Sequence, residues 1–405
     1  MIDEYTWEYN GINRPYGAPT PGLSVAPPRQ ISFLSITKST LSISKTTFFG
    51  DIDPSLVHAP GEAASGMRGM SMIRIGVIGA GPMGRGNASK LAAHADRCRL
   101  ACVIDPNTES AQAVAEKHGA RVFDNYIAAL DEVDAVVIAT PNHLHADQAV
   151  ACAQAGKHVF IEKPMALSTA DADRIVDAVD TAGVVSFVGF SVRFDAVPFT
   201  MKSIYESGDL GRLRSIWSRR IGFSRPGRRP GKPWRRDVAM SGGVLSELMA
   251  HEIDWMVSIA GIPDTVFCRK MSREHTDERN NDHIWLTLGF GAELTGTIEG
   301  SQMGTIADYY RGLMAEQGSL FTRNWGNDLF RQTSGDSEDH LTDIAGFDKY
   351  AHFLDAIEGK CASVADAAWG RTIVALTETA LQSAITGRAL AFSPESTANP
   401  KGIAV

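Results

Sequence analysis

The chain has 405 residues, of which 44% are hydrophobic and 21% are charged, as in an ordinary globular protein that is too long for one core. The formal net charge of −8 argues against a protein that binds nucleic acid or an anionic membrane through a basic surface. No segment reaches the roughly 18 uninterrupted apolar residues of a membrane helix. From the length we expect two packed domains and a tail, and from the charge we expect a small-molecule partner.

The first segment, residues 1–71, differs from the rest of the chain. It is polar and rich in serine and threonine, and five prolines interrupt it between Pro15 and Pro28. It shows no sustained helical or strand period. Such a composition is typical of a disordered tail, and we expect residues 396–405 to form a second one. Met70 or Met72 stands just before the first strong strand and is a candidate start of translation.

From Met72 to residue 192, short apolar strands alternate with helical stretches. Alternation of this kind predicts a doubly wound parallel sheet. Ser168 is placed to cap one of the helices, and Gly183 follows its end. The expected strands are 73–78, 100–104, 135–139, 159–161 and 184–189, and the helices include 111–118 and 169–182.

A glycine-rich turn follows the first predicted strand. Residues 79–84 read Gly-Ala-Gly-Pro-Met-Gly and open a helix, a context in which backbone amides receive a pyrophosphate. Asp105 ends the second strand about 20 residues later, where a carboxylate accepts hydrogen bonds from ribose hydroxyls. The alternatives are a chance glycine turn and a simple turn cap before Pro106. Because no arginine closely follows Asp105, NAD is favoured over NADP in this Rossmann domain. The residues expected to contact the cofactor here are Gly79, Gly81, Pro82, Met83, Gly84 and Asp105.

From residue 193 to 395 the pattern changes to alternating strands. It predicts an α+β domain with a large, mostly antiparallel sheet that helices cover on one side. An uncovered apolar face is normally buried against a partner, so we expect a homodimer or homotetramer formed through this sheet. The expected strands are 213–221, 265–271, 283–290 and 293–299, and the expected helices are 244–260, 348–358 and 365–383.

Several further segments carry a family resemblance. Residues 140–145 read Thr-Pro-Asn-His-Leu-His, residues 156–164 read Gly-Lys-His-Val-Phe-Ile-Glu-Lys-Pro, and residues 241–254 read Ser-Gly-Gly-Val-Leu-Ser-Glu-Leu-Met-Ala-His-Glu-Ile-Asp. Together with the glycine turn, they resemble the Gfo/Idh/MocA family, which includes glucose-fructose oxidoreductase and inositol dehydrogenases. The resemblance implies an NAD(P)-dependent oxidoreductase that transfers hydride between nicotinamide and a secondary alcohol or ketone. The substrate class it implies is a sugar, an inositol or a sugar acid.

The oxidation of a secondary alcohol needs a base and a positive charge that stabilises the alkoxide. Lys163 can supply that charge from the carboxyl edge of the sheet, and the resemblance implies the same role. Glu247, His251 and Asp254 recur at helical spacing and would share one helix face. By resemblance, His251 is the proton acceptor or relay, and Glu247 orients the substrate or the base. Glu247 stands at a position where the family more often has aspartate. Asp254 is expected to support the helix.

The resemblance also extends the cofactor and substrate sites. Pro164 is a candidate for a cis peptide bond, which is nearly confined to X-Pro sequences. Residues 219–236 contain eight basic residues, which form either a solvated or subunit-contacting loop or a clamp for a carboxylate or phosphate. The further residues expected to contact the cofactor are Thr140, Pro141, Asn142, His145, Glu162 and Lys163. The residues expected to bind the substrate are Arg193, Trp234, Arg235, Glu247 and His251.

Metal binding is not predicted. His143 and His145 lack a third ligand at suitable spacing, and the five scattered cysteines form neither a zinc motif nor a disulfide framework. Such cysteine usage fits a reducing cytoplasm. Two other functions stay open. One is a catalytically idle nucleotide-binding regulator, and the other is an enzyme that oxidises a sugar transiently to permit elimination or glycoside hydrolysis.

Overall fold

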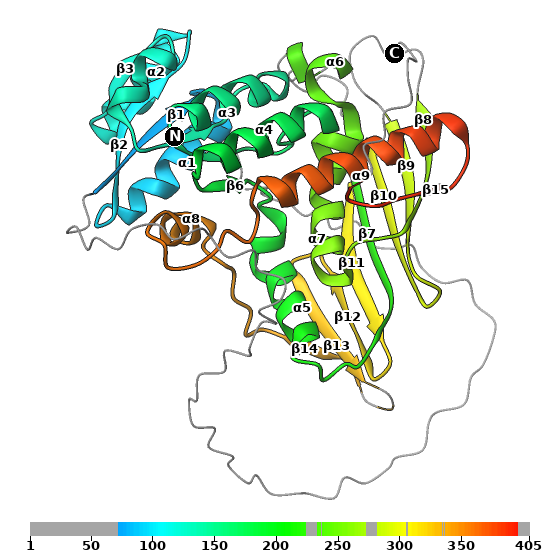
Figure 1. The fold of residues 1–405 in the computed structure, drawn as a ribbon. Coiled ribbons are helices and arrows are strands. Elements are labelled where there is room, and N and C mark those ends of the chain that lie inside the picture. The colour runs from blue at the N-terminus through cyan, green and yellow to red at the C-terminus, as the bar shows by residue number, and fades with distance from the viewer. Residues whose placement is uncertain are drawn as a thin grey trace, which may run out of the picture. The chain divides into compact units, whose positions relative to one another are not determined.

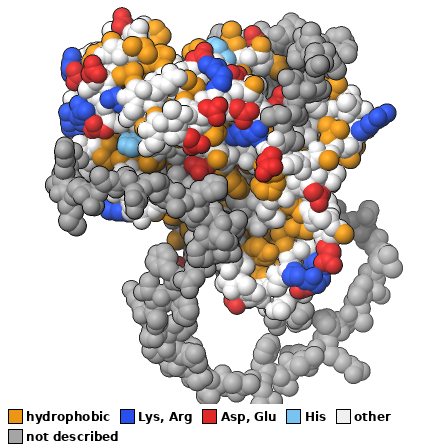
Figure 2. All heavy atoms as spheres, in the orientation of Figure 1, with side chains coloured by type: hydrophobic (Ala, Val, Ile, Leu, Met, Phe, Trp, Pro, Cys, Tyr) orange, Lys and Arg blue, Asp and Glu red, His pale blue; other side chains and the backbone are white. Residues whose placement is uncertain are grey.

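A computed structural model describes residues 72–395, with gaps at 224–232, 236, 273–281, 305–306, 334 and 336. The tails predicted at 1–71 and 396–405 lie outside the described residues. The face drawn in Figure 2 carries basic and acidic side chains interspersed with apolar ones.

The first sheet has six parallel strands in the order β3-β2-β1-β4-β5-β6, so the predicted doubly wound sheet is confirmed. The strand order reverses between β1 and β4, which is where such sheets bind ligands. β3 was not predicted, because three half-exposed or exposed residues give no apolar run. The strands are β1 (Ile73–Ile78), β2 (Cys98–Ile104), β3 (Arg121–Phe123), β4 (Ala135–Ile138), β5 (His158–Ile161) and β6 (Ser186–Val188), and the helices are α1 (Pro82–Leu91), α2 (Thr108–His118), α3 (His145–Gln154) and α4 (Thr169–Ala182).

The second sheet has nine strands in the order β14-β13-β12-β11-β7-β10-β9-β8-β15. All its pairs are antiparallel except β10 with β7, which confirms a mostly antiparallel sheet. The strands are β7 (Leu213–Phe223), β8 (Thr265–Ser272), β9 (Asp282–Phe290), β10 (Leu294–Gly304), β11 (Asp308–Ala315), β12 (Gly318–Arg323), β13 (Asp328–Thr333), β14 (Asp339–Leu341) and β15 (Leu390–Ala391).

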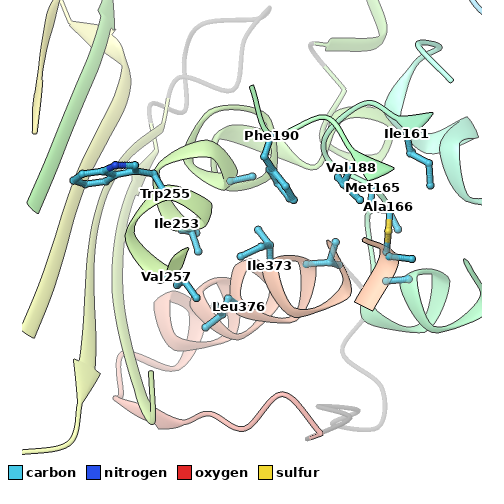
Figure 3. Close-up of a cluster of buried hydrophobic side chains, with 14 of the residues drawn as sticks. Ile161, Met165, Ala166, Val188, Phe190, Ile253, Trp255, Val257, Ile373 and Leu376 are labelled. Atoms are coloured by element: carbon cyan, nitrogen blue, oxygen red, sulfur yellow. The ribbon is translucent and has the colours of Figure 1, made fainter. Parts of the chain in front are cut away.

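Two helices pack on this sheet: α7 (Ala250–Ala260) contacts β7 and β10, and α9 (Ala367–Thr386) contacts β8 (Figure 1). The same helices share a buried cluster with the first sheet. Figure 3 shows Ile253 of α7 and Ile373 of α9 in one cluster with Met165 and Val188 of the nucleotide-binding region. One core therefore runs through both regions, and a domain boundary at residue 192 stays a prediction.

The chain returns to the first sheet through α8 (Lys349–Ile357), which lies within the predicted helix 348–358 and is capped by Asp348. Phe353 of this helix is fully buried and meets the Phe160 ring edge-on, with centroids 5.6 Å apart. Tyr350 stacks on the same ring at 5.7 Å. A segment from the last third of the sequence therefore completes the core of the nucleotide-binding region. The remaining long helix, α5 (Ala196–Glu206), links the two sheets along the chain.

Candidate active site

The glycine-rich turn forms a cradle between β1 and α1. Gly79 has a φ of +98°, and a Cβ atom there would lie 2.7 Å from the carbonyl oxygen of Ala139. A Cβ atom on Gly84 would lie 1.7 Å from the carbonyl oxygen of Gly79. Gly81 is extended, Pro82 begins the helix, and no side chain caps it. The backbone therefore lies bare at the helix N-terminus, as a bound pyrophosphate requires.

Asp105 is held at the end of β2 by two backbone amides. Its Oδ2 accepts from Ala80 N at 2.7 Å and its Oδ1 accepts from Asn107 N at 2.8 Å. Each carboxylate oxygen has further lone pairs for the hydroxyls of a ribose. The cradle and this carboxylate lie on adjacent strands, so the residues present fit a dinucleotide with an unmodified ribose.

Lys163 follows β5, and the peptide bond that joins it to Pro164 is cis, as expected. The lysine is half-buried, and its Nζ donates to the backbone oxygen of Glu247 at 2.5 Å. Burial lowers the pKa of Lys163, whereas the nearby Glu247 and Glu162 carboxylates act to raise this pKa. The hydrogen bond joins the carboxyl edge of the first sheet to the segment that leads into α7.

Glu247 lies in a π-helical turn, Leu245–Met249, rather than in a continuous α-helix. The helix predicted at 244–260 is present, but its first turn is π-helical and α7 proper begins at Ala250. The Asn142 amide donates to Glu247 Oε1 at 2.6 Å and to Ser241 O at 2.9 Å. Wider turns of this kind are frequent at functional sites. In this turn, Glu247 presents its carboxylate to Asn142 and its backbone carbonyl to Lys163.

His251 is half-buried in the first turn of α7. Its Nδ1 atom is enclosed and has no hydrogen-bond partner in the described part of the chain. Burial holds the pKa of His251 well below its ordinary value, and the positive charges of Lys163, Arg220, Lys349 and Arg311 lower this pKa further. The imidazole is therefore neutral at neutral pH and able to accept a proton.

Behind His251, the neighbouring Glu252 is fully buried and faces the second sheet. Its carboxylate accepts from Arg220 at 3.1 Å and from Arg311 at 3.2 Å. The hydroxyls of Ser218 and Tyr309 donate to the same carboxylate at 2.5 and 3.1 Å. These four donors come from β7 and β11, and their alternation along each strand places them on the face that α7 covers.

The comparisons with known proteins agree with this geometry. The model described as the oxidoreductase family, NAD-binding Rossmann fold, matches residues 73–190, and the model of the GFO/IDH/MocA C-terminal domain matches residues 199–320. The chain belongs to the Gfo/Idh/MocA oxidoreductase family. Its first region is an NAD-binding domain, and the predictions of an oxidoreductase and of NAD as its cofactor are confirmed.

Among the relatives in this family, scyllo-inositol 2-dehydrogenase (NAD(+)) of Bacillus subtilis strain 168 is 32% identical over 257 residues, which cover 62% of this chain and 73% of that protein. The 2,7-anhydro-N-acetylneuraminate hydratase of Escherichia coli strain K12 is 30% identical over 256 residues, covering 62% and 67%. The WlbA dehydrogenase from Bordetella pertussis in complex with NADH and UDP-GlcNAcA superimposes with a TM-score of 0.71 at 26% identity. That alignment covers 80% of this chain and 99% of the other.

Three residues expected to contact the cofactor have structural partners instead of free surface. Asn142 is 4% exposed and its amide donates to Glu247 and Ser241, and the other two are His145 and Glu162. His145 is 1% exposed, and its ring nitrogens lie 2.8 Å from Pro164 O and 2.9 Å from Thr140 O. Glu162 is 4% exposed and accepts from the Asn87 amide at 2.8 Å. Direct cofactor contact by any of the three side chains is therefore not supported. His145 and Glu162 hold the loops that follow β4 and β5, where Thr140 and Pro141 remain half-buried candidates.

Arg193 was expected to bind the substrate, but the structure buries it under α7 and α9. Its Nε lies 3.3 Å from Asp254 Oδ2, and its guanidinium donates to Val364 O at 3.0 Å. Trp369 donates to the other Asp254 oxygen at 2.7 Å. Burial raises the pKa of Asp254 to about 6. The expected support of the helix by Asp254 is present, and Arg193 is its partner rather than a ligand for substrate.

In the basic stretch 219–236, the structure describes the side chains of Arg219, Arg220, Trp234 and Arg235. Residues 224–232 and 236 lie outside the described residues. Arg219 points to the uncovered face of the sheet and pairs with Glu299 at 3.0 Å. Arg235 stacks on Trp234 at 5.2 Å, and its Nε lies 3.8 Å from Glu247 Oε2. Arg235 therefore lies beside Glu247, and its role in binding the substrate stays a prediction.

The sequence-based prediction missed Glu252, Tyr309, Arg311 and Lys349. The period-two alternation of a strand would have placed Ser218 and Arg220 on the same face of β7. Tyr309 and Arg311 could not be placed beside them, because β11 was not predicted. Lys349 follows a helix cap and belongs to no distinguishing motif. In the described ranges no group of three or more His, Cys, Asp or Glu side chains is arranged to hold a metal ion. No helix among those residues is long and apolar enough to cross a membrane.

Proposed function

We propose that this chain is an NAD-dependent dehydrogenase that oxidises a secondary alcohol of a sugar, inositol or sugar acid to the ketone. The observation that carries the proposal is the meeting of Lys163, Glu247 and His251 at the carboxyl edge of the first sheet, joined by the Lys163 bond to Glu247 O. The named activities of relatives in the family support the substrate class.

The bound NAD would supply the hydride acceptor, held by the glycine cradle and by Asp105. His251 takes the hydroxyl proton through Nε2, because its Nδ1 is enclosed. Lys163 places its ammonium beside the substrate oxygen and stabilises the negative charge that develops there. Glu247 fixes Lys163 through its carbonyl and offers a carboxylate, set by Asn142, to a second substrate hydroxyl. His251 would thus hold the proton that the alcohol loses, and the bound NAD would accept the hydride.

A second candidate reaction begins with the same oxidation but ends with re-reduction, so that NAD is regenerated and water is eliminated or added. The hydratase among the relatives favours it. The residues required at the reacting carbon are the same in both reactions. The two reactions differ in whether NADH accumulates.

The test is a panel of inositols, aldoses, aldonates and uronates incubated with purified protein and NAD. Absorbance at 340 nm reports net oxidation, and chromatography of the products reports conversion without NADH. We expect NADH formation with at least one polyhydroxylated substrate. Product without NADH would establish the second candidate instead. If no member of the panel changes in either assay, although NAD binds, the proposed function is wrong.

We further propose that the protein acts in the cytoplasm as a homodimer or homotetramer. All five cysteines are free thiols, which suits a reducing compartment. The uncovered face of the second sheet carries large apolar side chains, among them Phe267, Trp285 and Met314, each more than a third exposed. Their strand neighbours Cys268 and Leu286 are buried toward the helices. A surface of this kind fits an interface between two copies of the chain.

A further inference from the structure

The side-chain amide of Asn87 lies where three elements meet. Asn87 belongs to α1 and is 1% exposed. Its Nδ2 donates to Met83 O, one helical turn back, at 2.9 Å and to Glu162 Oε1, which follows β5, at 2.8 Å. Its Oδ1 accepts from the Tyr350 hydroxyl of α8 at 2.7 Å. Because a carbonyl and a carboxylate can only accept, the amide satisfies all its partners in this one orientation.

Glu162 is a buried carboxylate that immediately precedes Lys163. It is 4% exposed, and its second oxygen packs against Gly189, where an added Cβ atom would lie 3.0 Å from Oε2. In the described part of the chain, Glu162 forms no ion pair, and the hydrogen bond to its carboxylate comes from Asn87. Burial disfavours a charged carboxylate unless donors compensate it. The charge of Glu162 therefore depends on this amide.

Tyr350 holds the amide from its other side. Its ring stacks on Phe160, with centroids 5.7 Å apart. Burial raises the pKa of the Tyr350 hydroxyl, so the hydroxyl keeps its proton and remains the donor to Asn87. The neighbouring Lys349 acts on Glu162 at longer range, without an ion pair in the described ranges. The chain from α8 through Asn87 to Glu162 is thus made of directed hydrogen bonds.

The charge of Glu162 acts in turn on Lys163. Burial lowers the pKa of Lys163, and the charges of Arg220 and Arg235 lower this pKa further. The carboxylates of Glu247 and Glu162 act in the opposite direction. If Glu162 lost its donor and took up a proton, one of these two opposing charges would disappear. Lys163 would then lose its proton at a lower pH.

We propose that Asn87 and Tyr350 are positioning residues that fix the Glu162 carboxylate beside Lys163 and thereby keep Lys163 protonated for the reaction. The inference rests on the proposed function, in which the Lys163 ammonium stabilises the developing alkoxide. Asn87 and Tyr350 do not act on the substrate, and their effect passes through Glu162. The same amide ties the segment of Lys163 to α1, the helix that begins at the glycine cradle.

The first test follows the protonation of Lys163 without any turnover. Each protein is acetylated with acetic anhydride over a series of pH values, and mass spectrometry compares the labelling of the half-buried Lys163 with that of the exposed Lys117. Only the neutral amine reacts, so labelling rises as the lysine loses its proton. Asn87→Leu should move the labelling midpoint of Lys163 to a pH lower by about 1, because one nearby opposite charge is lost. The midpoint of Lys117 should not move.

Two further variants show whether the effect passes along the proposed chain. Tyr350→Phe keeps the ring on Phe160 and removes only the hydroxyl, so the midpoint should move in the same direction by a smaller amount. Glu162→Gln removes the charge and should match Asn87→Leu. The combination of Glu162→Gln with Asn87→Leu should move the midpoint no further than either alone.

Gln112→Leu and Tyr310→Phe are the matched controls. Gln112 donates to a carboxylate on the exposed side of α2, and the Tyr310 hydroxyl bonds to Arg219 on the uncovered face of the second sheet. Neither control should move the midpoint of Lys163. Melting temperature and NADH affinity check that every variant is folded. If Asn87→Leu does not fold, Tyr350→Phe decides, because it retains the packing of the ring.

The second test is the pH profile of kcat with an oxidised substrate. In Asn87→Leu, the alkaline limb should move to lower pH together with the labelling midpoint, so that kcat at a fixed alkaline pH falls by about 10-fold. KM and the acid limb that belongs to His251 should change little. In the Lys163→Ala background, Asn87→Leu should cause no further loss of kcat. A loss that persists in that background contradicts an action through Lys163.

The outcomes separate this inference from the function beneath it. A labelling midpoint of Lys163 that stays in place in both Asn87→Leu and Tyr350→Phe overturns the positioning role, whatever the turnover. A moved midpoint without oxidation of any compound supports the positioning of Lys163 and contradicts the dehydrogenase. Oxidation with an alkaline limb that does not move in Asn87→Leu leaves the dehydrogenase standing and overturns the positioning role.

Discussion

Lys163 influences the protonation of His251 because both side chains are taken out of water and both are cationic when protonated. The positive charge of Lys163 lowers the pKa of His251, and burial lowers the pKa of both. The neutral histidine and the charged lysine are the protonation states that an alcohol oxidation needs, so the same burial that costs stability also prepares the chemistry.

Replacing either residue should remove activity and leave the fold intact. We expect Lys163→Ala to lower kcat by about 10²-fold or more, because it removes the charge that stabilises the alkoxide. His251→Ala should lower kcat by roughly 10²- to 10⁴-fold, the range for a general base. The double variant should lose less than the product of the two. Steady-state kinetics and melting temperatures decide this, and near-normal turnover by folded variants would remove both residues from the mechanism.

The pH dependence follows from the direction of the His251 shift. Its pKa in the folded protein lies below the ordinary value of 6.5, so the unfolded chain binds the proton more readily. Stability is therefore lost as pH falls below about 6.5, and the fall in kcat/KM that comes from protonation of His251 should lie on the acid side of that value. A pH profile of His251→Ala should lack this acid limb. An unchanged limb would assign it to another group.

Arg193 and Asp254 illustrate how a buried ion pair holds a helix. We expect Arg193→Met to lower the free energy of unfolding by about 3–5 kcal/mol, because it strands a buried carboxylate. Arg193→Met combined with Asp254→Leu should recover much of that loss. Thermal and urea denaturation measure both. If Arg193→Met instead stayed fully stable but raised KM for the substrate, the original expectation that Arg193 binds substrate would be right.

At the scale of elements, the carboxyl ends of β1 and β2 form the cofactor site. Asp105→Ala should weaken NAD binding more than NADP binding, because the carboxylate accepts hydrogen bonds from the ribose hydroxyls of NAD but repels the 2'-phosphate of NADP. Fluorescence titration with NADH and NADPH measures the difference. Glu109→Ala, in the exposed first turn of α2, serves as the control. Equal weakening of both cofactors would mean that the loss of the bond to Ala80 N distorts the turn itself.

The elements that the sequence predicted well have signals within a few residues of themselves. The largely buried strands β1 and β4 stand out as apolar runs, and α4 has a capping serine and a closing glycine. The π turn at Leu245–Met249 has no such signal. The bonds that Glu247 accepts there, from Asn142 on its carboxylate and from Lys163 on its backbone oxygen, come from residues far away in sequence.

The candidate site divides in the same way. Gly84 and Lys163 could be found from motifs, since each has a local reason to be where it is. Lys349 and Arg311 could not, because only the return of α8 and the registry of β11 against β7 bring them to the site. Burial also reversed two expectations: His145 and Arg193 are chemically suited to bind ligands, but packing leaves them no free surface.

At the scale of the whole molecule, the uncovered face of the second sheet makes the assembly testable. Wild-type protein at micromolar concentration should have the mass of a dimer or tetramer by light scattering. Phe267→Asp combined with Trp285→Arg should shift it toward monomer, because both side chains are exposed on neighbouring strands of that face. Ile385→Arg, exposed on α9, is the matched control. A wild-type monomer would contradict the proposed interface.

The late position of α8 in the sequence also determines when the core of the first sheet can be completed during translation. The six strands of the first sheet have all been translated once Val188 is added, but Val188 N donates to Ala365 O, and Phe353 closes the core over Phe160. At roughly 5–20 residues per second, the ribosome needs about 10–35 s to cover that distance. For this interval the nascent nucleotide-binding half exposes the aromatic surface that α8 will later cover. We therefore expect newly made chains to be prone to aggregation until α8, which begins at Lys349, has emerged.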